Sequence, residues 1–169
     1  LSDYITGILN HYESETIAAS LKEEFDIHHL LEEIIDLLNI RYDCEINLPE
    51  NNKIMHCNKI ALEQIFLNLL TKSLKYNDKE KTVIAISFQE TTESYIFKIT
   101  DNGIGIPLDK QEEIFNLFTT LAETDRNGNL GNGIGLSTVK KLITSLGGEI
   151  KVSSVVNEGT SFTFSIKGS

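Results

Sequence analysis

The chain has 169 residues, of which 25 are acidic and 15 basic, so its formal net charge is −10 at pH 7. This length suits one domain with a good core plus a short extension, and the acidic balance without a clustered basic surface excludes nucleic acid as an expected partner. No apolar run approaches the length of a membrane span and no signal-peptide pattern occurs, so we expect no membrane segment. Cys44 and Cys57 lack C-x-x-C spacing, which is typical of reduced thiols in a cytoplasmic domain.

The N-terminal segment, residues 1–21, is expected to be a separate element from the domain formed by residues 22–169. Its apolar side chains recur at roughly helical spacing, and Ser2 with Asp3 is typical of a helix start. The segment has no partner of its own in the sequence. We therefore interpret it as part of a helix and a linker that precede the folded domain.

Residues 26–76 are expected to form a helix, an edge strand and a second helix. Asp26 is suited to cap the first helix, whose apolar side chains recur every three or four residues, and residues 44–48 alternate like a strand. Asn58 is suited to cap the second helix, which is expected to run to about Tyr76. The apolar side of this second helix carries Leu62, Ile65, Phe66, Leu69 and Leu70.

The remaining segments are expected to form two hairpins with a helix between them. Strands with alternating apolar residues are expected at 82–88, 95–100, 149–155 and 160–166. The helix between the hairpins spans residues 136–146 and is followed by Gly147 and Gly148, which favour a helix end. This order of elements predicts an α/β two-layer sandwich, with helices on one face of a mostly antiparallel sheet.

Two short glycine runs carry the strongest functional signal: DNGIGIP at residues 101–107 and GNGIGL at residues 131–136. Glycine lets backbone N–H groups approach a ligand closely. Asp101, at a strand end, could accept a hydrogen bond from an exocyclic amine such as N6 of adenine. The second run precedes a helix, whose N-terminal N–H groups and dipole suit phosphate. Together the two runs predict an ATP site.

Spacing argues against the other glycine motifs that bind nucleotides. A dinucleotide fingerprint beginning at Gly131 would need glycine in place of Leu136, and the motif G-x-x-x-x-G-K-[ST] does not occur in the sequence. The H-R-D and D-F-G motifs of protein kinases do not occur either.

A stripe of polar side chains runs along the helix expected at residues 58–76. Gln64, Asn68, Lys72 and Lys75 follow at spacings that confine them to one side of this helix, away from its apolar side. A solvated helix face would give the same spacing, but this stripe contains no acid in a chain rich in acids. We interpret it as a surface for a triphosphate, whose magnesium ion could take amide oxygens as ligands.

Five segments resemble, in family order, the N, G1, F, G2 and G3 boxes of bacterial sensor histidine kinases. They are residues 64–76, 101–105, 113–118, 131–136 and 158–162. The wider GHKL superfamily, with gyrase, mismatch-repair ATPases and a heat-shock chaperone, shares the nucleotide fold, while the F box and the Lys-Tyr pair that ends the N box favour the kinase branch over ATP-hydrolysing machines. The resemblance implies a Bergerat-type ATP-binding fold for residues 22–169, with ATP and magnesium as cofactors.

The resemblance also implies roles for single residues around the base. Asp101 would bind N6 of adenine, Tyr76 would flank the ring, and Thr160 would lie nearby on a strand. The other residues implied on this side are Gly103, Gly105, Ile106 and, from the F box, Phe118.

At the phosphates, the resemblance implies that Asn68 helps to hold magnesium and phosphate and that Lys75 contacts phosphate. The hinge and helix start beneath the phosphates would comprise Gly131, Gly133, Gly135 and Leu136. Residues 119–130, rich in Asn, Asp, Thr and Gly, would form a mobile ATP lid.

One position departs from the family pattern. The N box expects a second asparagine, the main magnesium ligand, where this chain has Lys72, and a charged ammonium group has no lone pair with which to coordinate a metal. Three interpretations stay open at this point: the lysine replaces the metal's charge and binds phosphate directly, the domain has lost catalysis, or the substitution was engineered.

The resemblance implies that the intact protein presents the γ-phosphate of ATP to a histidine on a dimerisation helix, as a homodimer that acts with a response regulator. Residues 1–21 would be the end of that helix. Of the four histidines in the chain, none lies in the family's phosphoacceptor motif, so we expect the accepting histidine elsewhere, in a protein whose cytosolic part this chain could be. The alternative is a catalytically degenerate nucleotide-binding or scaffolding domain.

Overall fold

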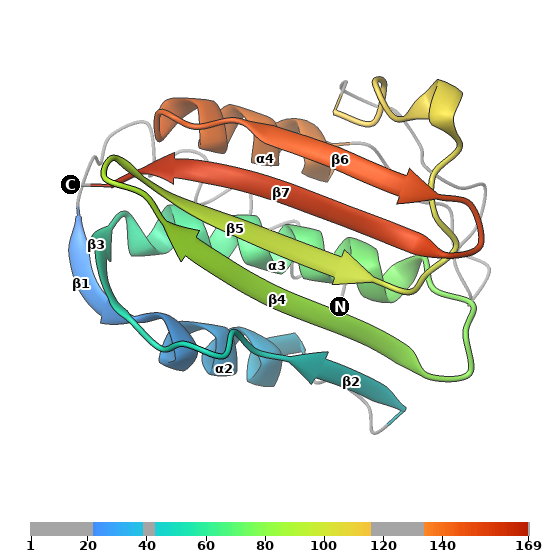
Figure 1. Cartoon of the computed structure of the whole chain (residues 1–169), viewed down its shortest axis with the longest axis horizontal. Coiled ribbons are helices and arrows are strands. Elements are labelled where there is room, and N and C mark those ends of the chain that lie inside the picture. The colour runs from blue at the N-terminus through green and yellow to red at the C-terminus, as the bar shows by residue number, and fades with distance from the viewer. Residues whose placement is uncertain (1–21, 39–42, 116–133, 169) are drawn as a thin grey trace.

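The structure, a computed structural model, describes residues 22–38, 43–115 and 134–168 (Figure 1). Residues 1–21 and the lid expected at residues 119–130 lie outside these ranges. The elements are β1 Glu23–Asp26, α2 Ile27–Leu38, β2 Cys44–Asn47, β3 Ile54–Cys57, α3 Lys59–Lys75, β4 Thr82–Glu90, β5 Ser94–Asp101, a 3-10 turn η1 Leu108–Lys110, α4 Ile134–Ser145, β6 Ile150–Val155 and β7 Gly159–Lys167.

A five-stranded sheet forms one layer, in the order β2-β4-β5-β7-β6. The β2 strand runs parallel to β4, and every other neighbouring pair in this sheet is antiparallel. Helices α2, α3 and α4 cover one face of the sheet (Figure 1). The predicted two-layer sandwich with a mostly antiparallel sheet is therefore confirmed, including the position of residues 44–47 at a sheet edge.

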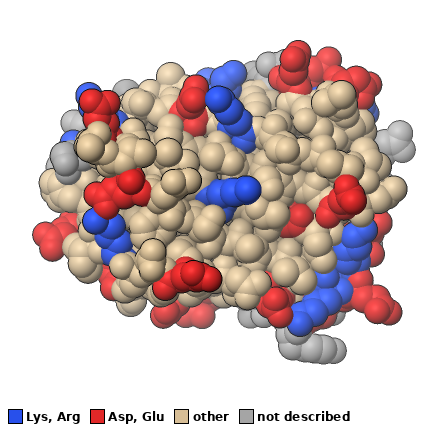
Figure 2. Space-filling model, in the orientation of Figure 1, with Lys and Arg blue, Asp and Glu red and all other residues tan. Residues whose placement is uncertain are grey.

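The two faces of the sheet differ in composition because strand residues alternate between them. Along β5, Tyr95, Phe97 and Ile99 are buried under the helices, whereas Lys98 between them is exposed. The opposite face, seen in Figure 2, carries small polar side chains, among which the hydroxyl groups of Thr100 and Ser161 lie 2.9 Å apart.

The core contains three mutually packed phenylalanine rings that hold α3 on the sheet. Phe97 of β5 and Phe164 of β7 are directly opposite in register, and their ring centroids lie 5.1 Å apart. Phe66 of α3 meets these two rings edge to face, at 5.4 and 5.5 Å. Such aromatic contacts stabilise by roughly 0.5–1.5 kcal/mol beyond the area they bury. Because Phe66 is fixed in this way, the C-terminal turn of α3 has a defined position beside the end of β5.

The helix ends follow the predicted capping residues. The Asn58 side chain accepts a hydrogen bond from the Ala61 N–H at the start of α3, and the Asp26 side chain accepts one from the His29 N–H at the start of α2. After α4, the Gly148 N–H donates to the Ile143 carbonyl, which ends that helix as expected.

One small sheet was not predicted from the sequence. Strands β1 and β3 pair antiparallel, with Phe25 opposite Met55 and both side chains buried. Each strand has only four residues, too few to show a clear alternation, which is why the pattern was missed. The cysteines Cys44 and Cys57 are free thiols, as expected, and burial raises the pKa of Cys57 to about 11.

Candidate functional site

A shallow, partly open pocket lies beside the C-terminal end of α3. It is lined by Lys72, Ser73, Tyr76, Asp101, Ile104, Gly105, Ile106, Thr160 and Phe162. The sequence analysis named six of these nine residues and missed Ser73, Ile104 and Phe162. Two of the missed residues had a signal: Ser73 precedes Tyr76 by one helical turn, and Phe162 follows Thr160 on the same face of β7.

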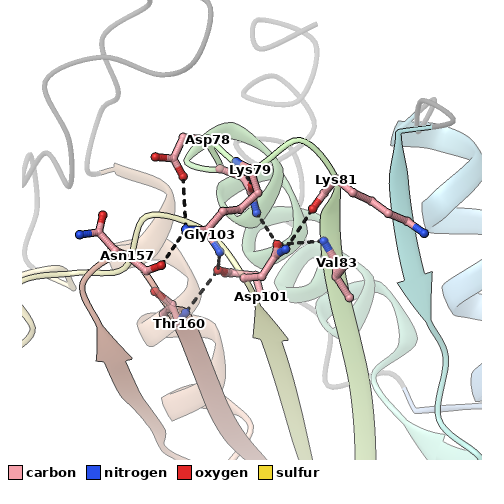
Figure 3. A network of polar contacts seen from close by, with 10 residues as sticks. Asp78, Lys79, Lys81, Val83, Asp101, Gly103, Asn157 and Thr160 are labelled. Atoms are coloured by element: carbon pink, nitrogen blue, oxygen red, sulfur yellow. Dashed lines mark hydrogen bonds and ion pairs between the residues drawn. The ribbon is translucent and has the colours of Figure 1, made fainter.

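Asp101 is the last residue of β5 and lines this pocket, with 8% of its surface exposed. Its Oδ1 atom accepts hydrogen bonds from the Gly103 N–H at 2.8 Å and the Thr160 N–H at 3.3 Å (Figure 3). Burial raises the pKa of this carboxyl, and the hydrogen bond from Gly103 acts in the opposite direction. Because both amides bind the same oxygen, the carboxylate is oriented with its Oδ2 atom as a further acceptor.

The segment after Asp101 is clamped between α3 and the β6–β7 hairpin. The Ile104 N–H donates to the Tyr76 carbonyl, and the Asn157 N–H donates to the Ile104 carbonyl. Gly105 has a φ of +76°, and a Cβ at that position would overlap the Val155 carbonyl oxygen, so a side chain cannot be accommodated there. The glycines of the DNGIG run are therefore needed for close packing of three backbone segments.

A second asparagine network supports the same corner from the other side. The Asn102 Oδ1 accepts bonds from the Val83 N–H at 2.9 Å and the Asn77 side chain at 2.8 Å, and its Nδ2 donates to the Lys81 carbonyl. Figure 3 shows Lys79 at the same corner, where its ammonium group donates to the Asn157 carbonyl at 2.6 Å. The sequence analysis assigned no role to Asn77 or Asn102. Their role is to hold the ends of β4 and β5 together.

Two lysines lie beside the ring of Tyr76, and one of them, Lys72, lines the pocket together with that ring. Tyr76 ends α3, and its ring centroid lies 5.7 Å from the Lys72 ammonium nitrogen and 5.8 Å from that of Lys75. Burial lowers the pKa of Lys72 from 10.5 to about 8, and the neighbouring charge of Lys75 acts in the same direction. Lys75 contacts the Tyr76 ring but is not among the residues that line the pocket. Two cations gathered beside one ring give this part of the site a positive potential, which suits an anion.

The four residues of the predicted polar stripe, Gln64, Asn68, Lys72 and Lys75, are not equally accessible to a ligand. Gln64 is fully buried and Asn68 is 3% exposed, while the two lysines are half-buried. Asn68 lies under α4, where a Cβ on Gly135 would come within 2.6 Å of its side-chain nitrogen. The docking of α4 on α3, which the helical spacing alone does not reveal, covers the first half of the stripe.

The remaining predicted site residues are divided between the core and the residues outside the described ranges. Leu136 is 1% exposed and packs in the hydrophobic core through α4. Gly103 does not line the pocket, but a Cβ on it would lie 2.6 Å from the carbonyl oxygen of Tyr76, which does. Phe118, Gly131 and Gly133 lie outside the described residues, so their expected roles stay predictions.

The sequence matches a known family over residues 57–169, the family described as histidine kinase-, DNA gyrase B- and HSP90-like ATPases. The chain belongs to this ATPase family. It is 32% identical over 164 residues to the signal transduction histidine-protein kinase ArlS of Staphylococcus aureus, a match that covers 96% of this chain and 35% of ArlS. The domain spans about a third or less of the length of the curated relatives that it matches.

Solved structures share the fold of this ATPase domain. A mycobacterial sensor histidine kinase, MprB, superposes with a TM-score of 0.74 at 22% identity, over 86% of this chain and 98% of that chain. Full-length ShkA, solved in complex with AMPPNP, superposes with a TM-score of 0.75 at 21% identity, over 98% of this chain and 36% of that chain.

These matches identify the chain as the ATP-binding catalytic domain of a sensor histidine kinase. They give no support to the alternative of a catalytically degenerate nucleotide-binding or scaffolding domain. None of the helices in the described ranges has the length and apolar character needed to cross a bilayer.

Proposed function

We propose that the domain binds ATP in the pocket beside α3, with adenine against Asp101 and the phosphates toward Lys72 and Lys75. The observation that carries this proposal is the buried Asp101 carboxylate, whose Oδ1 is held by two backbone amides. Its Oδ2 can accept a hydrogen bond from N6 of adenine, whereas guanine presents a carbonyl oxygen at the same place. The carboxylate therefore provides selectivity for adenine.

The other lining residues have complementary roles in this proposal. Tyr76 and Ile106 supply apolar surface for the two faces of the base, and Thr160 lies beside Asp101 through the register of β5 and β7. Gly103, Gly105 and Gly135 allow the close approaches that shape the pocket, and Leu136 anchors α4 in the core. Lys75 adds a second positive charge beside Tyr76, and Asn68 lies one helical turn before Lys72, against Gly135 of α4.

Substitution of Asp101 by asparagine tests the adenine assignment. We expect Asp101→Asn to weaken ATP binding by about 1–3 kcal/mol and to remove the preference for ATP over GTP, because an amide can turn its NH₂ group toward the base. Isothermal titration calorimetry with both nucleotides measures this effect. Asp109→Asn, at an exposed position of η1, is the matched control and should bind like the wild type. Unchanged affinities in Asp101→Asn would contradict the assignment.

We further propose that the bound ATP donates its γ-phosphoryl group to a histidine on a dimerisation helix of the longer protein, which then serves a response regulator. In this step the bond from the γ-phosphorus to the bridging oxygen breaks, a bond to an imidazole nitrogen forms, and ADP leaves. Such transfer depends on positioning and charge neutralisation more than on a protein nucleophile. Labelled ATP, with the histidine helix of this protein supplied in trans, tests the transfer. If ATP loses its label but the helix does not become labelled, the proposed transfer to histidine is wrong.

The family implies a magnesium ion at the phosphate end, but the described residues do not fit one. Magnesium sites in proteins use one or two carboxylates or other hard oxygen ligands. The carboxylate among the lining residues is Asp101, which belongs to the base end, and no group of three or more His, Cys, Asp or Glu side chains suited to a metal occurs in the described ranges. Asn68 Oδ1 is a buried acceptor without a hydrogen-bond partner among the described residues, but Asn68 does not line the pocket and its amide lies against Gly135 of α4. We therefore derive no step through a metal ion.

A further inference from the structure

A lysine ammonium group belongs to the pocket in which the proposed function places the nucleotide. Lys72 lines the pocket together with Tyr76 and Asp101, so a cation and a carboxylate line the same cavity. The backbone of Lys72 is fixed because its carbonyl accepts the Tyr76 N–H at 3.1 Å, in the last turn of α3. The position of this ammonium group therefore depends on a well-packed helix.

The surroundings of Lys72 favour an anion and disfavour a second cation. The ammonium nitrogens of Lys72 and Lys75 lie within 5.7 and 5.8 Å of the same ring centroid, so each charge raises the energy of the other. A triphosphate would relieve this repulsion, whereas a divalent metal ion at the same end would add two positive charges to it. The half-buried position of Lys72 reduces screening by solvent, which strengthens both effects.

We propose that the pocket binds its nucleoside triphosphate in the metal-free form, with the Lys72 ammonium group in the place of the divalent cation. This inference rests on the proposed function, because it concerns the same pocket and the same nucleotide. In this respect the proposed site differs from an ATP site that requires magnesium. The chemical basis is that a fixed monovalent cation binds phosphate oxygens directly by hydrogen bonds and charge, but brings no coordination shell.

The test uses calorimetry on the full 169-residue chain with ATP in excess EDTA and with ATP in excess magnesium. We expect the wild type to bind ATP in EDTA at least as tightly as in magnesium. Lys72→Ala should bind ATP at least tenfold more weakly in EDTA, while Lys72→Arg, which keeps the charge, should retain most of the affinity. Lys72→Asn should bind ATP more tightly in magnesium than in EDTA, because an amide oxygen can coordinate the ion.

Lys98→Ala is the matched control, because it removes a lysine charge from the exposed, helix-free face of the sheet. It should bind ATP like the wild type in both solutions, and thermal unfolding of each variant checks that it is folded. A wild type that binds ATP at least tenfold more tightly in magnesium would overturn the inference.

Adenosine separates failure of this inference from failure of the proposed function. If adenosine binds and ATP binds only with magnesium, the pocket is a nucleotide site and the metal-free inference is wrong. If neither adenosine nor ATP binds in either solution, both the proposed function and the inference are wrong. If adenosine binds and ATP binds more tightly in EDTA, both are supported.

Discussion

The base end and the phosphate end of the pocket are built from different parts of the chain. At the base end, glycines bring backbone against backbone. A Cβ on Gly103 would lie 2.6 Å from the Tyr76 carbonyl oxygen, and one on Gly105 or Gly159 would overlap the carbonyl oxygen of Val155 or Asp101. At the phosphate end, the close neighbour of Gly135 is a side chain, that of Asn68.

This difference explains which end of the site can change its chemistry. A wall made of backbone contacts depends on the positions of whole strands and turns, so a substitution there disturbs the sheet. An end made of side chains can exchange one functional group for another while the helix stays in place. Lys72, in the last turn of α3, is an example, because it stands where the family pattern has asparagine. Its backbone still makes the ordinary helical hydrogen bond, in which the Lys72 carbonyl accepts the Tyr76 N–H.

The largest effect is expected for Gly159→Ala at the base end. Gly159 has a φ of +136°, which alanine rarely adopts, and the added Cβ would overlap the Asp101 carbonyl oxygen in the neighbouring strand. We expect the free energy of unfolding to fall by about 3 kcal/mol or more, measured by urea denaturation, with loss of ATP binding at temperatures where the domain unfolds.

Gly168→Ala serves as the control for Gly159→Ala. A Cβ on Gly168 would meet its nearest atom, the Glu93 carbonyl oxygen, at an ordinary 3.5 Å. Its free energy of unfolding should stay within about 0.5 kcal/mol of the wild type. Equal stability of the two variants would show that the base end is not held by backbone contacts.

The base end was also the part of the site that the sequence predicted best. The alternating run of β5 ends at Asp101, and hairpins join segments that are close in the chain, so the pairing of β4 with β5 and of β6 with β7 could be predicted. The parallel pairing of β2 with β4 and the small β1–β3 sheet could not, because they join segments far apart through few residues.

The phosphate end was predicted less well for a physical reason. Helical periodicity places Asn68 and Lys72 on one side of α3 but does not say what covers that side. Polar residues are usually exposed, and the burial of Asn68 depends on α4, whose Gly135 permits the close approach. Asn68 was expected to be exposed but is buried, and this difference is informative. Places where the local sequence pattern fails to predict the structure are often functional or strained sites.

The second largest effect is expected for Lys72→Met in the absence of nucleotide, and it is an increase in stability. The pKa of Lys72 falls from 10.5 to about 8 on folding because of burial and Lys75. At pH 7 the charged form therefore costs the folded state up to about 3 kcal/mol, and methionine removes the charge while it keeps the apolar stem. Urea denaturation at pH 7 should show a gain of about 1–3 kcal/mol.

The gain from Lys72→Met should decrease as the pH rises. Between about pH 8 and pH 10.5 the unfolded wild type binds more protons than the folded one, so the stability of the wild type increases with pH in this window. Lys75 and Tyr76 lie beside Lys72, Asp101 lines the same pocket, and these three residues are the same in both variants. Lys98→Met, on the exposed face, should show no such gain. A loss of stability in Lys72→Met at pH 7 would contradict the expectation that burial and the charge of Lys75 make the charged form of Lys72 unfavourable in the folded state.

The smallest effect is expected for Gly135→Ala at the phosphate end. The added Cβ would lie 2.6 Å from the Asn68 Nδ2 and 2.9 Å from its Oδ1, so the amide must move, although no backbone atom is as close. Alanine is favoured over glycine inside a helix by about 0.5–1 kcal/mol, which offsets much of that cost. We therefore expect the free energy of unfolding to change by less than about 1 kcal/mol.

A double-mutant cycle with Asn68→Ala, measured by urea denaturation, tests this explanation. In the Asn68→Ala background the amide is gone, so Gly135→Ala should stabilise the domain by the full preference of a helix for alanine over glycine. A loss as large as that of Gly159→Ala, present in both backgrounds, would mean that backbone contacts fix the phosphate end as firmly as they fix the base end.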